Sequence, residues 1–186
     1  MGILGQSDRI NDFKTDLEYS LESRENEIFD KFYFRAFSGL VQITFVSDIT
    51  TQKRGIDKLL NFDNGKVVSI DEKKRRTNYG DIALELWSVW EQRKRGWLYT
   101  SEADYIIYAI MPVSKVYLLP TLLLRNAWLK NEVLWTDKYR EVRAYNKTYV
   151  TISRAIPPAP LLNAIKEEMN QSLSDNERIE FNHRLL

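Results

Sequence analysis

The chain of 186 residues contains no cysteine and a single histidine, His183. Without cysteine there can be no disulfide, thiolate nucleophile, iron–sulfur cluster or cysteine zinc site. A lone histidine in a charged segment also argues against a histidine metal cage and against a Ser-His-Asp triad. We therefore expect any chemistry to depend on carboxylates, lysine, arginine or tyrosine, together with a hard, oxygen-seeking metal such as Mg²⁺.

Long hydrophobic runs are also missing, since no stretch approaches the roughly 20 uninterrupted apolar residues of a membrane span. The first residues lack a basic segment followed by an apolar one, so we expect a cytoplasmic protein with no membrane partner. Apolar residues make up 44% of the chain and charged residues 28%, which excludes disorder of the whole chain. The net charge is +1, but residues 1–30 are acidic, so the remainder is moderately basic and compatible with a polyanionic partner.

Hydrophobic periodicity and breaker residues divide the chain into an α/β core over 1–156 and a helical extension over 157–186. The extension follows a proline-rich break, and its helices are candidates for a lid or for an arm that joins two copies in a homodimer. The expected elements are a helix over 7–34, strands over 40–48, 55–62 and 66–74, a helix over 81–93, strands over 103–111 and 116–119, a helix over 121–134, a strand over 148–156, a helix over 161–173 and a short helix capped by Ser174 or Asp175.

The pair Asn64-Gly65 between two apolar runs is the strongest short-range signal for a β-hairpin. Asp57 lies in the first strand of this hairpin, and the second strand ends in Asp71-Glu72-Lys73-Lys74. Because residues i and i+2 of a strand share a face, an acid and a lysine at this spacing lie about 6–7 Å apart. A carboxylate from the partner strand would complete a cluster that suits a divalent cation.

The turn length decides which acid faces Asp57, because a slip of one residue exchanges the two faces of a strand. A two-residue turn at 64–65 places Asp57 opposite Glu72, and the motif is then Glu72 with Lys74. A three-residue turn with Gly65 in the left-handed conformation places Asp57 opposite Asp71 instead. The turn signal alone leaves both registers open.

The hairpin and the helix predicted after it resemble the core of the PD-(D/E)xK nuclease superfamily, and are most similar to small phage and bacterial members with a D-E-K triplet. The resemblance covers about residues 7–119. It implies a restriction-endonuclease-like α-β-β-β-α-β core, in which helices flank a mixed sheet. Ile56 departs from the family's proline, and Glu72 departs from its usual apolar residue. The residues that carry the resemblance are Asp57, Asp71, Glu72, Lys73 and Glu85.

The resemblance implies a metal-dependent DNA endonuclease, in which a metal-activated water hydrolyses a phosphodiester bond. It favours the register that joins Asp57 to Asp71 and Lys73. Asp57 and Asp71 would then hold Mg²⁺ or Mn²⁺, with the backbone carbonyl of Glu72 as a further ligand. Lys73 would orient the attacking water, and Glu85 would be a further catalytic acid.

Basic residues beside this predicted site would contact the phosphate backbone of DNA, or of RNA. A phage-encoded member of the family would act in the cytoplasm of its host. The alternative from another class is a catalytically inactive nucleic-acid-binding or assembly protein that keeps the nuclease fold. The residues expected to bind nucleic acid are Lys74, Arg75, Arg76, Arg93 and Arg95.

Overall fold

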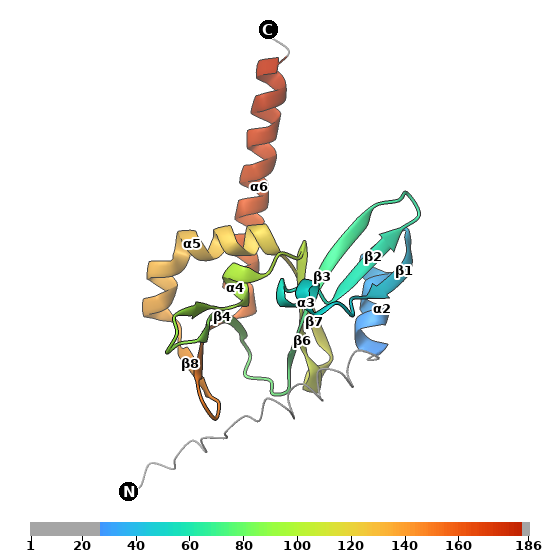
Figure 1. Cartoon of the computed structure of the whole chain (residues 1–186). Coiled ribbons are helices and arrows are strands. Elements are labelled where there is room, and N and C mark those ends of the chain that lie inside the picture. The colour runs from blue at the N-terminus through green and yellow to red at the C-terminus, as the bar shows by residue number, and fades with distance from the viewer. Residues whose placement is uncertain (1–26, 184–186) are drawn as a thin grey trace, which may run out of the picture.

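The computed structural model describes residues 27–183 and shows an α/β protein with two sheets, joined by helices (Figure 1). The first twenty residues of the helix predicted over 7–34 lie outside this range; within it the helix is α2 (Glu27–Ala36). In Figure 1 the five-strand sheet and α2 lie on one side, α4 and α5 on the other, and α6 stands out from the body. Within 27–183, no helix is long and apolar enough to cross a membrane.

The five-strand sheet is mixed and has the order β1-β2-β3-β6-β7. β3 and β6 are parallel, and the other neighbours are antiparallel. α2 covers one face, where Phe29 and Tyr33 pack against Leu60, Val68 and Ile70. The strands are β1 (Leu40–Phe45), β2 (Lys58–Phe62), β3 (Val67–Arg75), β6 (Tyr105–Ile110) and β7 (Lys115–Pro120), with α3 (Ile49–Lys53) between β1 and β2 and η2 (Met111–Val113) between β6 and β7.

The four-strand sheet is antiparallel and has the order β5-β4-β9-β8. Its buried side chains form the larger core together with residues of β6, β7 and three helices, so this core joins the two sheets. Trp128 is fully buried in this core. The elements are β4 (Ile82–Val89), β5 (Lys94–Arg95), α4 (Trp97–Thr100), α5 (Thr121–Lys138), β8 (Glu141–Tyr145), β9 (Val150–Ile156) and α6 (Pro158–His183).

The helix predicted over 81–93 is wrong, because this segment forms β4 and the turn after it. Ile82 and Leu86 fit a helical spacing, but Ile82, Leu84 and Leu86 also alternate along a strand, and all three are buried. A helix would have turned Leu84 away from the core. The connection from β3 to β6 is therefore β4, β5 and the single-turn helix α4, rather than one long helix.

The extension after the proline break is one helix rather than the predicted two, since α6 runs without interruption past Ser174. The Ser174 hydroxyl donates to the carbonyl of Gln171 at 2.8 Å, so it bonds within its own helix instead of capping a new one. Leu161, Ala164 and Ile165 at the beginning of α6 belong to the larger core.

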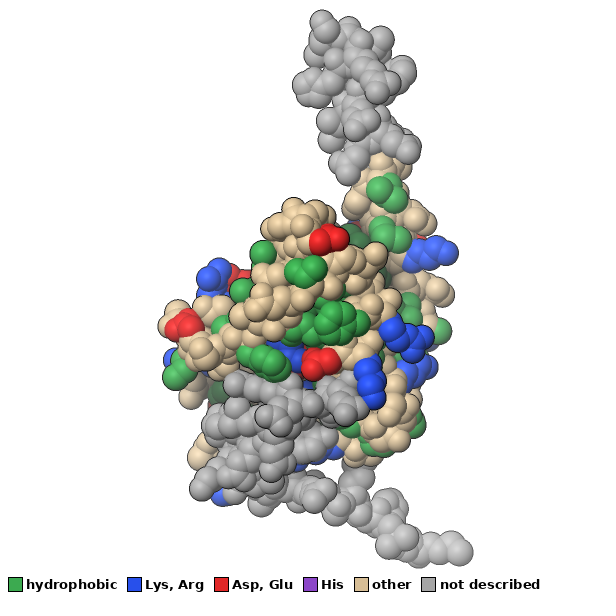
Figure 2. Space-filling view, turned by 90° about the vertical axis from the view of Figure 1, so that its right-hand side faces the viewer, with side chains coloured by type: hydrophobic (Ala, Val, Ile, Leu, Met, Phe, Trp, Pro, Cys, Tyr) green, Lys and Arg blue, Asp and Glu red, His purple; other side chains and the backbone are tan. Residues whose placement is uncertain are grey.

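The remaining predicted strands and the helix after 120 are confirmed as β1, β2, β3, β6, β7, β9 and α5, with ends that differ by a few residues. β8 was not predicted. Figure 2 looks onto the side of α2 and β1 and shows hydrophobic side chains there beside lysines and arginines. The exposed large apolar residues of α2, β1 and α3 are Phe34, Val41, Phe45 and Ile49.

Candidate functional site

The β2–β3 hairpin has the register that joins Asp57 to Asp71. Phe62 N–H donates to Lys66 O at 2.9 Å, and Gly65 between them has a φ of +79°. The pairing of Lys58 with Ile70 then continues toward Asp57 and Asp71. The three-residue turn with a left-handed glycine is therefore confirmed.

Asp57 is held against the middle of β3 by one backbone and one side-chain hydrogen bond, which lie on either side of Asp71. Asp57 N–H donates to Ile70 O at 2.8 Å, and Asp57 Oδ2 accepts from Glu72 N–H at 2.8 Å. The backbone of Glu72 thus lies directly beside the Asp57 carboxylate. Asp57, directly before β2, and Asp71 of β3 are thus neighbours at the open end of the hairpin, where the charge of Asp57 acts on Asp71.

Asp71 is fully buried, and Lys73 Nζ lies 2.5 Å from its Oδ1. Apart from this ion pair, neither Asp71 carboxylate oxygen has a hydrogen-bond partner among the described residues. Burial raises the pKa of Asp71, Lys73 opposes the rise, the negative charge of Asp57 adds to it, and the nearby Ser101 hydroxyl lowers it again. Burial lowers the pKa of Lys73, but Asp71, Asp57 and Glu85 outweigh it and raise the pKa above its ordinary value.

Glu85 reaches the same region from β4 rather than from the predicted helix. Its Oε1 accepts from Trp97 N–H at 3.2 Å. Burial raises the pKa of Glu85, and Lys73, the Trp97 amide and Lys94 oppose the rise. Gly96 is required here, because a Cβ at this position would overlap the carbonyl group of Glu85.

A groove of about 610 Å³ opens beside Lys73 and Glu85, between the end of β3 and the four-strand sheet. Ala83, Ala144 and Thr151 contribute small side chains to it. The full lining consists of Glu72, Lys73, Lys74, Arg75, Arg76, Thr77, Tyr79, Ala83, Glu85, Trp97, Tyr108, Val142, Ala144, Thr151 and Ser153. We call this feature the groove.

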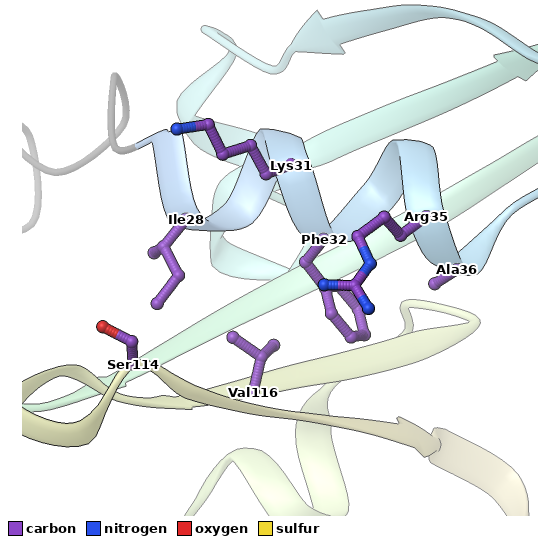
Figure 3. Close-up of a pocket in the computed structure, with 7 residues that line it drawn as sticks. All are labelled: Ile28, Lys31, Phe32, Arg35, Ala36, Ser114 and Val116. Carbon is purple, nitrogen blue, oxygen red and sulfur yellow. The ribbon is translucent and has the colours of Figure 1, made fainter.

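A second cavity of about 510 Å³ lies between α2 and the region of β7 (Figure 3). Its cationic side chains are Lys31 and Arg35, and it contains no carboxylate. The groove is therefore the stronger candidate for metal chemistry. The residues that line the second cavity are Ile28, Lys31, Phe32, Arg35, Ala36, Ser114 and Val116.

The opposite face of β3 carries a buried ionic cluster under α2, as the register predicts for Glu72 and Lys74. Lys58 is 1% exposed, and its Nζ lies 2.9 Å from Glu72 Oε1. Tyr33 donates its hydroxyl proton to the same Glu72 oxygen at 2.6 Å. Lys74 Nζ lies 5.2 Å from the centre of the Phe29 ring, so this lysine points toward α2.

The other residues expected to bind nucleic acid are held in different places. Arg75 is 12% exposed and makes a 3.0 Å ion pair with Asp81. Arg76 is exposed and lines the groove. Arg93 and Arg95 lie on the β4–β5 hairpin, where their guanidinium groups stack on tryptophan rings.

The residues around Asp57 and Asp71 fit a hard divalent cation. A fully buried carboxylate whose nearest cation is a single lysine keeps oxygen lone pairs that such an ion can satisfy. Over 27–183, no three histidine, aspartate or glutamate side chains lie close enough to form a metal cluster. Two carboxylates suit Mg²⁺ or Mn²⁺, because these ions keep several waters.

Sequence reasoning gave no role to Gly55 or Ser101, which enclose the Asp71 carboxylate from two loops. Gly55 has a φ of +77°, and a Cβ there would lie 2.9 Å from Ser101 Oγ and 3.0 Å from Asp71 Oδ2. Glu102 N–H donates to Arg54 O at 2.8 Å, which joins the two loops. Nothing local in the sequence marks this contact, since the loops are almost fifty residues apart.

We expect Gly55→Ala to destabilise the protein by about 1–3 kcal/mol and to weaken any activity that needs Asp71. The added methyl group combines backbone strain with a clash against Asp71 and Ser101. Gly65→Ala is the matched control, because Gly65 has a φ of +79° but no atom within 4 Å of its Cβ position. Urea unfolding of both variants measures the difference, and equal losses would contradict the close contact.

We expect Glu85→Gln to become more stable relative to the wild type as the pH rises from about 4.5 to 8. The folded protein holds the Glu85 proton to higher pH than the unfolded chain does, because burial raises the pKa of this carboxyl. Its contribution to wild-type stability is therefore greatest at low pH and is lost as the pH rises through the raised pKa. Thermal unfolding across this pH range tests the trend, and a constant difference would contradict it.

No family model, curated protein or solved structure matches this chain.

Proposed function

We propose that the protein is a metal-dependent nuclease that hydrolyses phosphodiester bonds in DNA. The observation that carries the proposal is the Asp71 carboxylate, which is fully buried, paired with Lys73 and placed next to Asp57. Burying a carboxylate costs stability even beside one lysine, so its presence next to Lys73, which lines the groove, favours a functional role.

The roles follow from the positions of three side chains and one stretch of backbone. Asp57 and Asp71 would hold Mg²⁺ or Mn²⁺, and the backbone of Glu72 lies beside them. The ion would supply a more acidic water and would stabilise negative charge on the phosphate. Lys73 stays protonated because its pKa is raised, so it orients water or phosphate as a cation rather than acting as a base.

The arrangement of α2 and the five-strand sheet supports the same proposal. α2 covers a sheet in which β1, β2 and β3 form an antiparallel meander and β6 returns parallel to β3. This order is the one expected of a restriction-endonuclease-like core. The connection from β3 to β6 departs from that core, because it contains strand β4 where the core has a helix. Glu85 therefore reaches the groove from a strand.

The test is cleavage by the purified full chain. Plasmid DNA, single-stranded DNA and RNA are each incubated with Mg²⁺, Mn²⁺ or excess chelator, and the products are separated by electrophoresis. We expect cleavage of DNA that requires the added metal and stops with chelator. No cleavage of any substrate with either metal would contradict the proposal.

The alternative, a nucleic-acid-binding or assembly protein without catalysis, is favoured by one observation. Asp57 and Asp71 have no third carboxylate close enough to complete a metal cluster among the described residues. Binding of DNA without cleavage, and with no effect of Mn²⁺ on protein stability, would support this alternative.

A further inference from the structure

We propose that the groove takes a single nucleic-acid strand rather than a duplex, and that Tyr79 stacks on one of its bases. This inference rests on the proposed function, since it names the substrate class of the same site. It is carried by the depth of the acidic residues, by the small side chains in the groove and by the environment of Tyr79.

Asp71 lies behind the surface of the groove rather than on it, and Lys73 is the residue of the pair that lines the groove. Asp71 is fully buried, and the side chain of Lys73 is only 27% exposed. A duplex is wide and stiff and cannot bend locally inward, so its phosphates reach a recessed lysine less readily than those of a single strand. A single strand can bend its backbone inward and bring one phosphate to Lys73.

The wall formed by the four-strand sheet leaves space for such a strand. β4, β8 and β9 present small side chains to the groove where large ones would fill it. Thr151 and Ser153 add hydroxyl groups, so this surface is partly polar. The small residues of this wall are Ala83, Ala144, Thr151 and Ser153.

Tyr79 lies at the exposed end of the same groove. Tyr79 is 61% exposed, although two guanidinium groups lie over its ring. The guanidinium of Arg75 lies 4.9 Å from the ring centre, and that of Arg140 lies 5.9 Å from it.

Arg75 is itself fixed, because it pairs with Asp81 and donates to Tyr108 Oη at 3.1 Å. The tyrosine ring is thus oriented by a rigid neighbour and still open to solvent. Aromatic rings held next to cations are the usual platforms for unpaired bases, because every base has a face that can stack.

Fluorescence anisotropy of labelled oligonucleotides in the presence of EDTA measures binding without cleavage. The arms are single-stranded DNA, single-stranded RNA of the same sequence and the corresponding DNA duplex. We expect the wild type to bind single strands at least about tenfold more tightly than the duplex. Comparison of the two single-stranded oligonucleotides shows whether the groove prefers DNA or RNA.

We expect Tyr79→Ala to weaken single-strand binding by about 5- to 100-fold, and Tyr79→Phe to retain it within about twofold, because the ring and not the hydroxyl stacks. Tyr145→Ala is the matched control: Tyr145 is also exposed, at 45%, but does not line the groove. Its affinity should equal that of the wild type.

Equal or tighter binding of the duplex would overturn the proposed substrate class, and unchanged binding by Tyr79→Ala would overturn the stacking. These outcomes are independent of cleavage. If single strands bind in a way that depends on Tyr79 but are not cleaved in Mg²⁺ or Mn²⁺, the proposed nuclease activity is contradicted and the proposed single-strand binding site is supported.

Discussion

Replacing Asp71 by asparagine is expected to reduce metal-dependent cleavage by about 100- to 1,000-fold without unfolding the protein. Asparagine keeps the shape of the side chain but removes the negative charge that would hold the cation. The fold should survive, because burial raises the pKa of Asp71 and a neutral amide is cheaper to bury. Lys73 loses its partner, but its side chain is 27% exposed and can be hydrated.

Single-turnover cleavage of single-stranded DNA in Mn²⁺ measures this loss. Asp137→Asn is the matched control, because Asp137 is exposed on α5 and should be replaceable without effect. A rate for Asp71→Asn within about threefold of the wild type would mean that another site, or a contaminating enzyme, cuts the DNA.

Replacing Lys58 by methionine is expected to lower the free energy of unfolding by about 3–5 kcal/mol, the cost of leaving a buried charge unpaired. Lys58 Nζ lies 2.9 Å from Glu72 Oε1 and 3.3 Å from Asp30 Oδ1. It also lies 4.7 Å from the centre of the Phe45 ring. The variant would leave Glu72 buried without its nearest cation.

Urea unfolding of Lys58→Met, Glu72→Leu and the double variant separates the pair from the packing. The double variant should recover most of the loss of the single variants, because two apolar side chains of similar length need no partner. Strictly additive losses would show that Lys58 and Glu72 are not coupled. The same variants should retain the β2–β3 register if the turn at Gly65 determines it.

The β2–β3 hairpin could be predicted because its signals are local. Asn64-Gly65 marks the turn, and alternation places Val68 and Ile70 on the buried face, where they are 4% and 0% exposed. Once the turn had three residues, Asp57 and Asp71 had to meet. The sequence alone could not choose the turn length, because both turns suit this dipeptide.

β4 was mistaken for a helix because its apolar residues fit both periods. Pairing with β9 decides the outcome, and that partner lies about seventy residues further along the chain. Glu85 nevertheless arrives at the groove, since its neighbours Leu84 and Leu86 take the buried face of the strand and leave Glu85 on the other.

The positions of the basic side chains could not be predicted from the run of charges alone. Lys74 follows Lys73 directly, yet the alternation of the strand turns it toward Phe29 and α2. Arg75 pairs with Asp81, and only Arg76 of this run is exposed. Tyr79 belongs to no recognisable sequence motif, so its position in the groove could be found only from the structure.

The most direct test of the account is a titration of the full chain with Mn²⁺, followed by electron paramagnetic resonance. The central claim is that Asp57 and Asp71 together hold one divalent cation, and this measurement needs no knowledge of the substrate. The account predicts one bound Mn²⁺ per wild-type chain, loss of that ion in Asp57→Asn and in Asp71→Asn, and retention in Asp137→Asn. A wild type that binds no Mn²⁺, or an Asp71→Asn variant that binds it as tightly as the wild type, would contradict it.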